Sequence, residues 1–190
     1  MGTTSFPTSA DDFATTSPTN LGDSDSKGRT HSERHDDMEA AMEAVQAGGF
    51  WADYTPTWTA TGTSPTLGNG SLIGRYARFG KTVIASGRLT IGSSTTVAGS
   101  SFWFFDLPSD CPGYNALTTV PRGLLRVSDS STGTSYVGAV DFADGLTKIT
   151  PRLANSSATY ATSANVTETV PITWATGDIL EWQITYETSA

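Results

Sequence analysis

Residues 180–187 read LEWQITYE and alternate strictly between apolar and polar side chains. A period of two is typical of a β-strand with one buried face and one face in water. Residues 83–91, VIASGRLTI, repeat this alternation, and every second residue from Val83 to Ile91 falls on the apolar or glycine face. These two segments predict paired strands and make the chain mainly β.

Seven further segments carry strand-like composition between turn signals such as Gly68-Asn69-Gly70 and Asp144-Gly145. They are 54–60, 71–79, 101–107, 119–128, 134–142, 146–153 and 166–173. The chain also contains 31 Thr and 22 Ser, and Thr favours strands over helices. With no helix predicted between them, these strands predict an antiparallel, jelly-roll-like β-sandwich over residues 50–190.

A single helix is predicted over residues 30–47, THSERHDDMEAAMEAVQA, within a segment that spans 30–49. Thr30 and Glu33 form a capping box, and glycines end the helix. Its apolar and histidine positions are spaced four and three apart, as in a coiled-coil seam. Such a helix packs either on its own domain or on copies of itself, and the spacing favours copies. The seam residues are His31, His35, Met38, Met42 and Val45.

Residues 1–29 are mostly Ser, Thr, Asp, Gly and Pro and show no periodicity. This segment lacks the apolar surface to fold alone. Two interpretations fit it: a disordered tail, or an extended arm that becomes ordered when its apolar side chains dock into another protein. The candidate anchors are Phe6, Phe13 and Leu21.

Charge and hydropathy exclude several partner classes. The formal net charge is −8 and no basic cluster occurs, so nucleic acid is not an expected partner. No apolar run approaches the roughly 18 residues of a membrane span, and no signal segment is apparent. Cys111, the one cysteine, cannot form an intrachain disulfide. These features predict a protein that folds in a cytoplasm.

The sequence offers little catalytic equipment. The two histidines, His31 and His35, have the i, i+4 spacing of metal ligands, but no third ligand follows at a recognisable spacing. A Ser-His-Asp triad cannot form in residues 50–190, which contain no histidine. Aspartates and glutamates are present there, yet no spacing singles out a glycosidase-like pair. We therefore expect no enzyme activity, no metal and no cofactor, with a polysaccharide-cleaving enzyme as the remaining alternative.

Aromatic side chains are the remaining lead to a binding site. Four of them lie in or near predicted turns, where a ring can stack on a sugar. Packing in the core or between subunits is the competing interpretation. The candidate glycan contacts are Trp103, Tyr114, Tyr136 and Tyr160.

Two stretches resemble small virion appendage proteins of tailed bacteriophages, especially those of actinobacteria. The first is SFPTSADDF followed by THSERHDDMEAAMEAVQ, similar to a polar arm that runs into a short helix. The second is the succession YTPTWT, LGNG, GRY and GK from residue 54 to residue 81. The resemblance covers roughly residues 4–91. It implies a homotrimer in which the arm grips a capsid or tail protein, the helices form a three-stranded stem and the β domains project from the virion surface.

The function expected from this resemblance is a non-enzymatic, homotrimeric surface appendage, assembled in the host cytoplasm, whose outward β domain binds host-surface glycans. One alternative keeps this architecture and makes the protein a capsid decoration protein or head fibre that stabilises or adorns the shell. A bacterial carbohydrate-binding module is a further alternative. The stem has only two heptads with Met in the seam, so the β domains would have to supply much of the trimer's stability.

Overall fold

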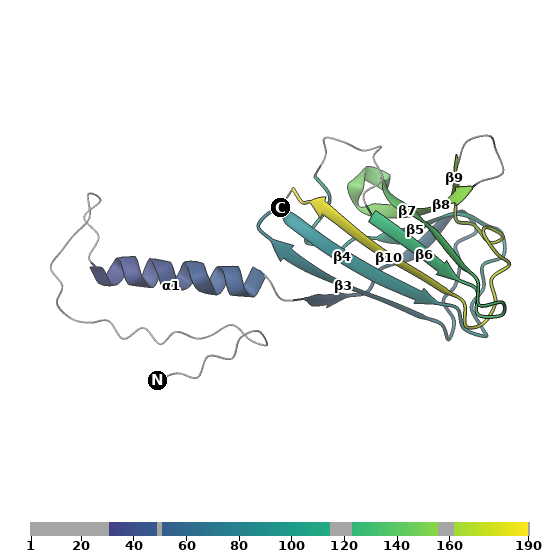
Figure 1. The fold of residues 1–190 in the computed structure, drawn as a ribbon, viewed down its shortest axis with the longest axis horizontal. Helices are drawn as coiled ribbons and strands as arrows, with labels where there is room; N and C mark the ends of the chain where they lie inside the picture. The colour runs from purple at the N-terminus through teal and green to yellow at the C-terminus, as the bar shows by residue number, and fades with distance from the viewer. Residues whose placement is uncertain (1–30, 49–50, 115–122, 156–161, 190) are drawn as a thin grey trace. The chain divides into compact units, whose positions relative to one another are not determined.

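The computed structural model describes residues 31–48, 51–114, 123–155 and 162–189 (Figure 1). The chain divides between Phe50 and Trp51 into two units, the first containing the helix and the second the β domain. The predicted arm, with Phe6, Phe13 and Leu21, lies outside the described residues, and so does the Thr30 cap.

The helix α1 spans His31–Gly48, one residue later at each end than the sequence predicts. Glycines follow the predicted end of the helix, where the lack of a β-carbon suits chain reversal. Three apolar seam side chains are exposed in this single chain: Met38 by 62%, Met42 by 51% and Val45 by 73%. The helix therefore presents an apolar seam at heptad spacing.

Ten strands form one continuous, curled antiparallel sheet in the spatial order β1-β3-β4-β10-β6-β7-β8-β5-β2, with β9 paired to β8. The mainly β, antiparallel prediction is confirmed, and the hydrogen bonds run through a single sheet where two were expected. A short 3₁₀ turn, η1 (Asp144–Leu146), joins β7 to β8. The strands are β1 Ala52–Tyr54, β2 Trp58–Gly62, β3 Ser71–Phe79, β4 Thr82–Thr90, β5 Ser100–Asp106, β6 Gly123–Ser128, β7 Ser135–Ala143, β8 Lys148–Asn155, β9 Thr162–Asn165 and β10 Ile179–Glu187.

The structure corrects two of the predicted strands. The segment 54–60 is divided around Pro56 into β1, which pairs with β3, and β2, which pairs with β5 at the other edge of the sheet. Proline has no N–H to donate to a ladder, so the strand is interrupted there. The segment 166–173 forms only an isolated bridge from Thr167 to Val170, and the sequence did not predict β9.

The last strand lies in the middle of the sheet. β10 pairs with β4 along its whole length and with β6 on its other side. Figure 1 shows β3, β4, β10 and β6 running side by side. The predicted inner face of β10 is buried throughout: Leu180, Trp182, Ile184 and Tyr186 are at most 3% exposed. β10 therefore joins the early strand pair β3–β4 to the later strands.

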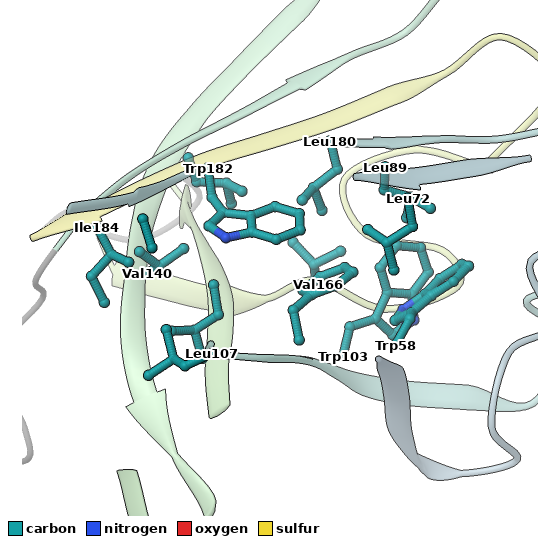
Figure 2. Packing of buried hydrophobic residues seen from close by; sticks show 14 of the residues in the cluster. Trp58, Leu72, Leu89, Trp103, Leu107, Val140, Val166, Leu180, Trp182 and Ile184 are labelled. Atoms are coloured by element: carbon teal, nitrogen blue, oxygen red, sulfur yellow. The ribbon is translucent and has the colours of Figure 1, made fainter. Parts of the chain in front are cut away.

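The two halves of the curled sheet pack face to face through aromatic rings. The Phe105 ring on β5 stacks on the Trp182 ring on β10 with centroids 4.5 Å apart, although these strands are not neighbours in the sheet. The Trp103 ring lies 4.6 Å from the Trp58 ring and 4.7 Å from the Trp174 ring. Figure 2 shows Trp182 and Leu180 pointing from β10 into this cluster. Four tryptophans, Trp58, Trp103, Trp174 and Trp182, are thus part of the core.

The indole of Trp182 needs a residue without a side chain beneath it. Gly87 on β4 is the register partner of Trp182, and a β-carbon there would lie only 2.1 Å from Cζ2 of the indole. The next strand repeats the arrangement, since a β-carbon on Gly74 would lie 2.5 Å from the Tyr54 ring. Glycine on the inner face of these strands is therefore a packing requirement.

A buried carboxylate fixes the entry into β10. Asp178 is 1% exposed; its Oδ1 accepts hydrogen bonds from the backbone N–H and the hydroxyl of Ser130, at 2.8 and 2.9 Å. Its Oδ2 accepts a third from the Ala175 N–H at 2.7 Å. Buried polar groups must be paired to avoid a desolvation cost. Asp178 thereby ties the β6–β7 turn to the turn before β10.

Candidate functional site

A hollow with a volume of about 500 Å³ lies on the outward face of β1, β3, β4 and β10. Most of its lining side chains are polar or charged, and we call it the β3–β4 hollow. Ligand sites in proteins commonly have volumes of about 300–1,000 Å³. The side chains that line it on this face are Asp53, Ile73, Arg75, Ser86, Arg88 and Glu181.

Strand register brings these residues together in two rows across the sheet. In one row Asp53 is opposite Arg75, and Arg75 is opposite Ser86. In the other, Ile73 is opposite Arg88, and Arg88 is opposite Glu181. The lining also includes the glycines at 74 and 87, which contribute only backbone. On the outward face the small side chain of Ser86 stands between the long side chains of Arg75 and Arg88.

Two ion pairs share one carboxylate beside the hollow. Glu181 Oε1 lies 3.6 Å from Arg88 Nε, and Glu181 Oε2 lies 3.6 Å from Arg126 Nη1. All three side chains are more than a third exposed, so these pairs contribute little to stability. Arg88 and Glu181 both line the hollow, whereas Arg126 lies outside it.

Trp51 adds an aromatic surface next to the hollow. The guanidinium carbon of Arg75 lies 4.7 Å from the centre of the Trp51 ring, within the range of a cation–π contact. Trp51 is 45% exposed, whereas the other four tryptophans are buried. It therefore presents an indole to solvent beside charged and polar groups.

A second hollow, of about 350 Å³, lies on the other side of Glu181 over β6, β7 and β10. Its lining includes Leu124 and Val137, which are 72% and 69% exposed, together with Arg126. This hollow is more apolar and has no carboxylate besides Glu181. The two hollows therefore differ in chemistry although they share one glutamate.

Three tyrosines have a raised pKa. Burial raises the pKa of Tyr54, beside the hollow, and that of Tyr186, whose hydroxyl donates to the Cys111 carbonyl oxygen at 2.8 Å. The Tyr76 hydroxyl donates to Asp110 Oδ2 at 2.6 Å, and this bond raises the pKa of Tyr76 to about 12. All three hydroxyls therefore stay protonated near neutral pH, and those of Tyr76 and Tyr186 donate hydrogen bonds.

Three of the four glycan contacts predicted from sequence lie among the described residues, and their surroundings differ. Trp103 is 0% exposed, and its Nε1 donates to Ser100 Oγ at 2.9 Å, so its assignment as a glycan contact is wrong. Tyr136 packs partly buried against the core. Tyr114 is 49% exposed, with the Lys81 ammonium 6.0 Å from its ring centre. Tyr160 lies outside the described residues.

The residues of the predicted seam lie on the helix. His35 is exposed on α1, and His31 is the first residue of that helix. In the part of the chain that the structure describes, no group of three or more His, Cys, Asp or Glu side chains is placed to hold a metal ion.

Burial raises the pKa of the Cys111 thiol, which is 0% exposed. No described helix is long and apolar enough to cross a membrane.

The residues that line the β3–β4 hollow were not predicted from the sequence. Their signal was partial: Ser86 and Arg88 fall on the polar face of one alternating segment, and Glu181 on that of the other. Alternation assigns a face but does not give the register that places Arg88 opposite both Ile73 and Glu181. No protein-family model, curated protein or solved structure matches this chain.

Proposed function

We propose that the protein is a non-enzymatic, homotrimeric surface appendage of a bacteriophage virion. The observation that carries the proposal is the apolar seam of α1, where Met38, Met42 and Val45 are exposed at heptad spacing. Exposed apolar side chains in such a row favour association of helices. Three copies of α1 would form a short stem.

The length of α1 supports association. A solitary helix of 18 residues with so narrow an apolar stripe is marginal in water, because most of the stability of protein helices comes from packing of their apolar face. The sequence of α1 also carries four acidic residues that are exposed or half-exposed: Asp36, Asp37, Glu39 and Glu43. Burying the seam against two further copies would stabilise the helix and leave these carboxylates at the rim.

The remaining parts of the proposal follow the chain outward from the stem. The arm, residues 1–29, attaches the trimer to a capsid or tail protein through Phe6, Phe13 and Leu21. The jelly-roll-like β domain faces the medium at the virion surface and binds host-surface glycans. The β3–β4 hollow supports this last step, since it gives the outward face a concavity lined in part by charged side chains, with an exposed indole beside it.

The seam can be tested with charge. In the double variant Met38→Glu, Met42→Glu, we expect the mass in solution to fall from three times 20.0 kDa to a single chain, because carboxylates in the seam repel one another. Sedimentation equilibrium of the full chain measures this mass. The matched control, Ala40→Glu with Ala47→Glu, adds the same charge on the opposite side of the heptad and should remain a trimer. A monomeric unaltered chain would contradict the homotrimer, and a trimeric seam variant would contradict the stem.

Attachment to the particle is tested separately. Antibodies against residues 51–190 should label virions in negative-stain electron microscopy, and a chain lacking residues 1–29 should stay trimeric but no longer sediment with virions. The apolar anchors are lost in that truncation while the stem and β domain are kept. Label on heads would identify the decoration or head-fibre role, and label at the tail tip a role in host attachment. Unlabelled virions, or a truncated chain that still sediments with them, would contradict the proposal.

A further inference from the structure

We propose that the β3–β4 hollow binds an uncharged saccharide. The inference deepens the proposed surface role and rests on it for the natural ligand: it assigns the glycan contact to Asp53, Arg75, Ser86, Arg88 and Glu181, with Trp51 beside them. None of these residues is among the glycan contacts predicted from sequence.

The side chains of the hollow match the hydrogen-bonding pattern of a sugar. A sugar hydroxyl both donates and accepts, so neighbouring hydroxyls need acceptors and donors close together. The carboxylates of Asp53 and Glu181 supply acceptors, whereas Arg75 and Arg88 supply planar, paired donors. Because Glu181 and Arg88 lie 3.6 Å apart, a single hydroxyl pair can contact both groups.

The formal charges select a neutral ligand. Two carboxylates, Asp53 and Glu181, balance two guanidiniums, Arg75 and Arg88, so the lining has no net charge. The arginines would attract an acidic polysaccharide, but the carboxylates, at similar distances, would repel it. The chain as a whole carries −8 and would repel a polyanion further. A neutral sugar has no such cost.

Trp51 provides the apolar contact that sugar sites require. One face of a pyranose ring is lined by C–H groups, which pack on aromatic rings. The Trp51 indole is 45% exposed and contacts Arg75, which itself lines the hollow. Only the Arg75 side chain therefore separates a saccharide bound over Ser86 from the Trp51 ring. The second hollow has two exposed aliphatic side chains and no tryptophan side chain open to solvent, so it lacks this feature.

An array of immobilised oligosaccharides tests the inference with the full chain. The probes are uncharged hexose, deoxyhexose and N-acetylhexosamine oligosaccharides, beside others that contain uronic or sialic acid. We expect binding to one or more neutral glycans and no preference for the acidic ones. Arg88→Ala should weaken that binding by about tenfold or more, because a charged donor to the sugar is lost.

The chain offers a matched control in Arg126→Ala. Arg126 and Arg88 are both about half exposed and both lie 3.6 Å from Glu181, but only Arg88 lines the hollow. Arg126→Ala should change the affinity less than about twofold. A second variant, Ser86→Gln, fills the floor without removing a charge and should also abolish binding.

Several results would overturn the inference: no neutral glycan bound, a preference for acidic glycans, or equal losses in the two arginine variants. Binding that survives both Arg88→Ala and Ser86→Gln would do the same. These outcomes are separable from failure of the proposed function, because neither the mass of the chain nor its attachment to virions depends on the hollow. Both arginine variants should remain trimers.

Discussion

Replacement of Gly87 by valine should destabilise the β domain by more than about 3 kcal/mol, although valine is the better strand former. Any β-carbon at this position would lie 2.1 Å from Cζ2 and 2.5 Å from Cε2 of the Trp182 indole. The indole cannot move aside freely, because Trp182 is 3% exposed and stacks on Phe105. Overpacking of a dense core forces such groups out of their rotamers.

Urea unfolding followed by tryptophan fluorescence measures this change. Ser86→Val introduces the same side chain one residue earlier, on the outward face, and should shift the free energy of unfolding by less than about 0.5 kcal/mol. The loss caused by Gly87→Val should shrink in a Trp182→Ala background, since the clash has then been removed. If the free energy of unfolding of Gly87→Val lies within about 1 kcal/mol of that of the parent protein, the close packing of the indole on β4 is contradicted.

The second large effect is expected at Asp178. Asp178→Ala removes a buried carboxylate that accepts three hydrogen bonds and leaves the N–H groups of Ser130 and Ala175 without an acceptor. Each hydrogen bond to a charged group contributes about 1.5–3 kcal/mol to stability. Because the three bonds share one carboxylate, their contributions do not simply add, and we expect the free energy of unfolding to fall by roughly 3–4 kcal/mol. In thermal unfolding this corresponds to a fall in Tm of roughly 10 °C.

Asp129→Ala is the control for this prediction. The Asp129 Oδ1 also accepts three hydrogen bonds, from Ser131 N, Ser131 Oγ and Thr132 N, and they lower the pKa of its carboxyl. These bonds lie in an exposed turn, where water replaces a lost acceptor, so the fall in Tm should be much smaller. An equal fall in Tm in the two variants would show that the stabilisation by the hydrogen bonds of Asp178 does not depend on its burial.

The local pattern of the sheet was predictable from sequence, because alternation depends only on neighbouring residues. The inner faces of β4 and β10 were assigned correctly, from Val83 to Ile91 and from Leu180 to Tyr186. Long-range features were not predictable in this way. β1 and β2 lie at opposite edges of the sheet, and their pairing with β3 and β5 depends on contacts between residues far apart in the sequence. In the sequence itself, Pro56 indicated only that the strand is interrupted there.

The candidate site was less accessible to sequence analysis than the fold. Trp103 was a candidate glycan contact, with packing in the core as the competing interpretation. Trp58 and Trp174, from distant segments, contact its ring, so packing in the core is the interpretation that the structure supports. Arg88 and Glu181 lie 93 positions apart and meet only through strand register. Polar residues on an outward strand face are ordinary, so nothing in the sequence separated the pair from other exposed charges.

The central place of β10 has a consequence for synthesis of the chain. The ribosome makes β3 and β4 early, but the strand that connects this hairpin to β6 comes from residues 179–187. Until those residues emerge, β4 and β6 each lack a neighbour and expose backbone groups that can pair with another chain. We therefore expect the β domain to fold only after almost all of it has been translated, with its aggregation risk concentrated in that interval.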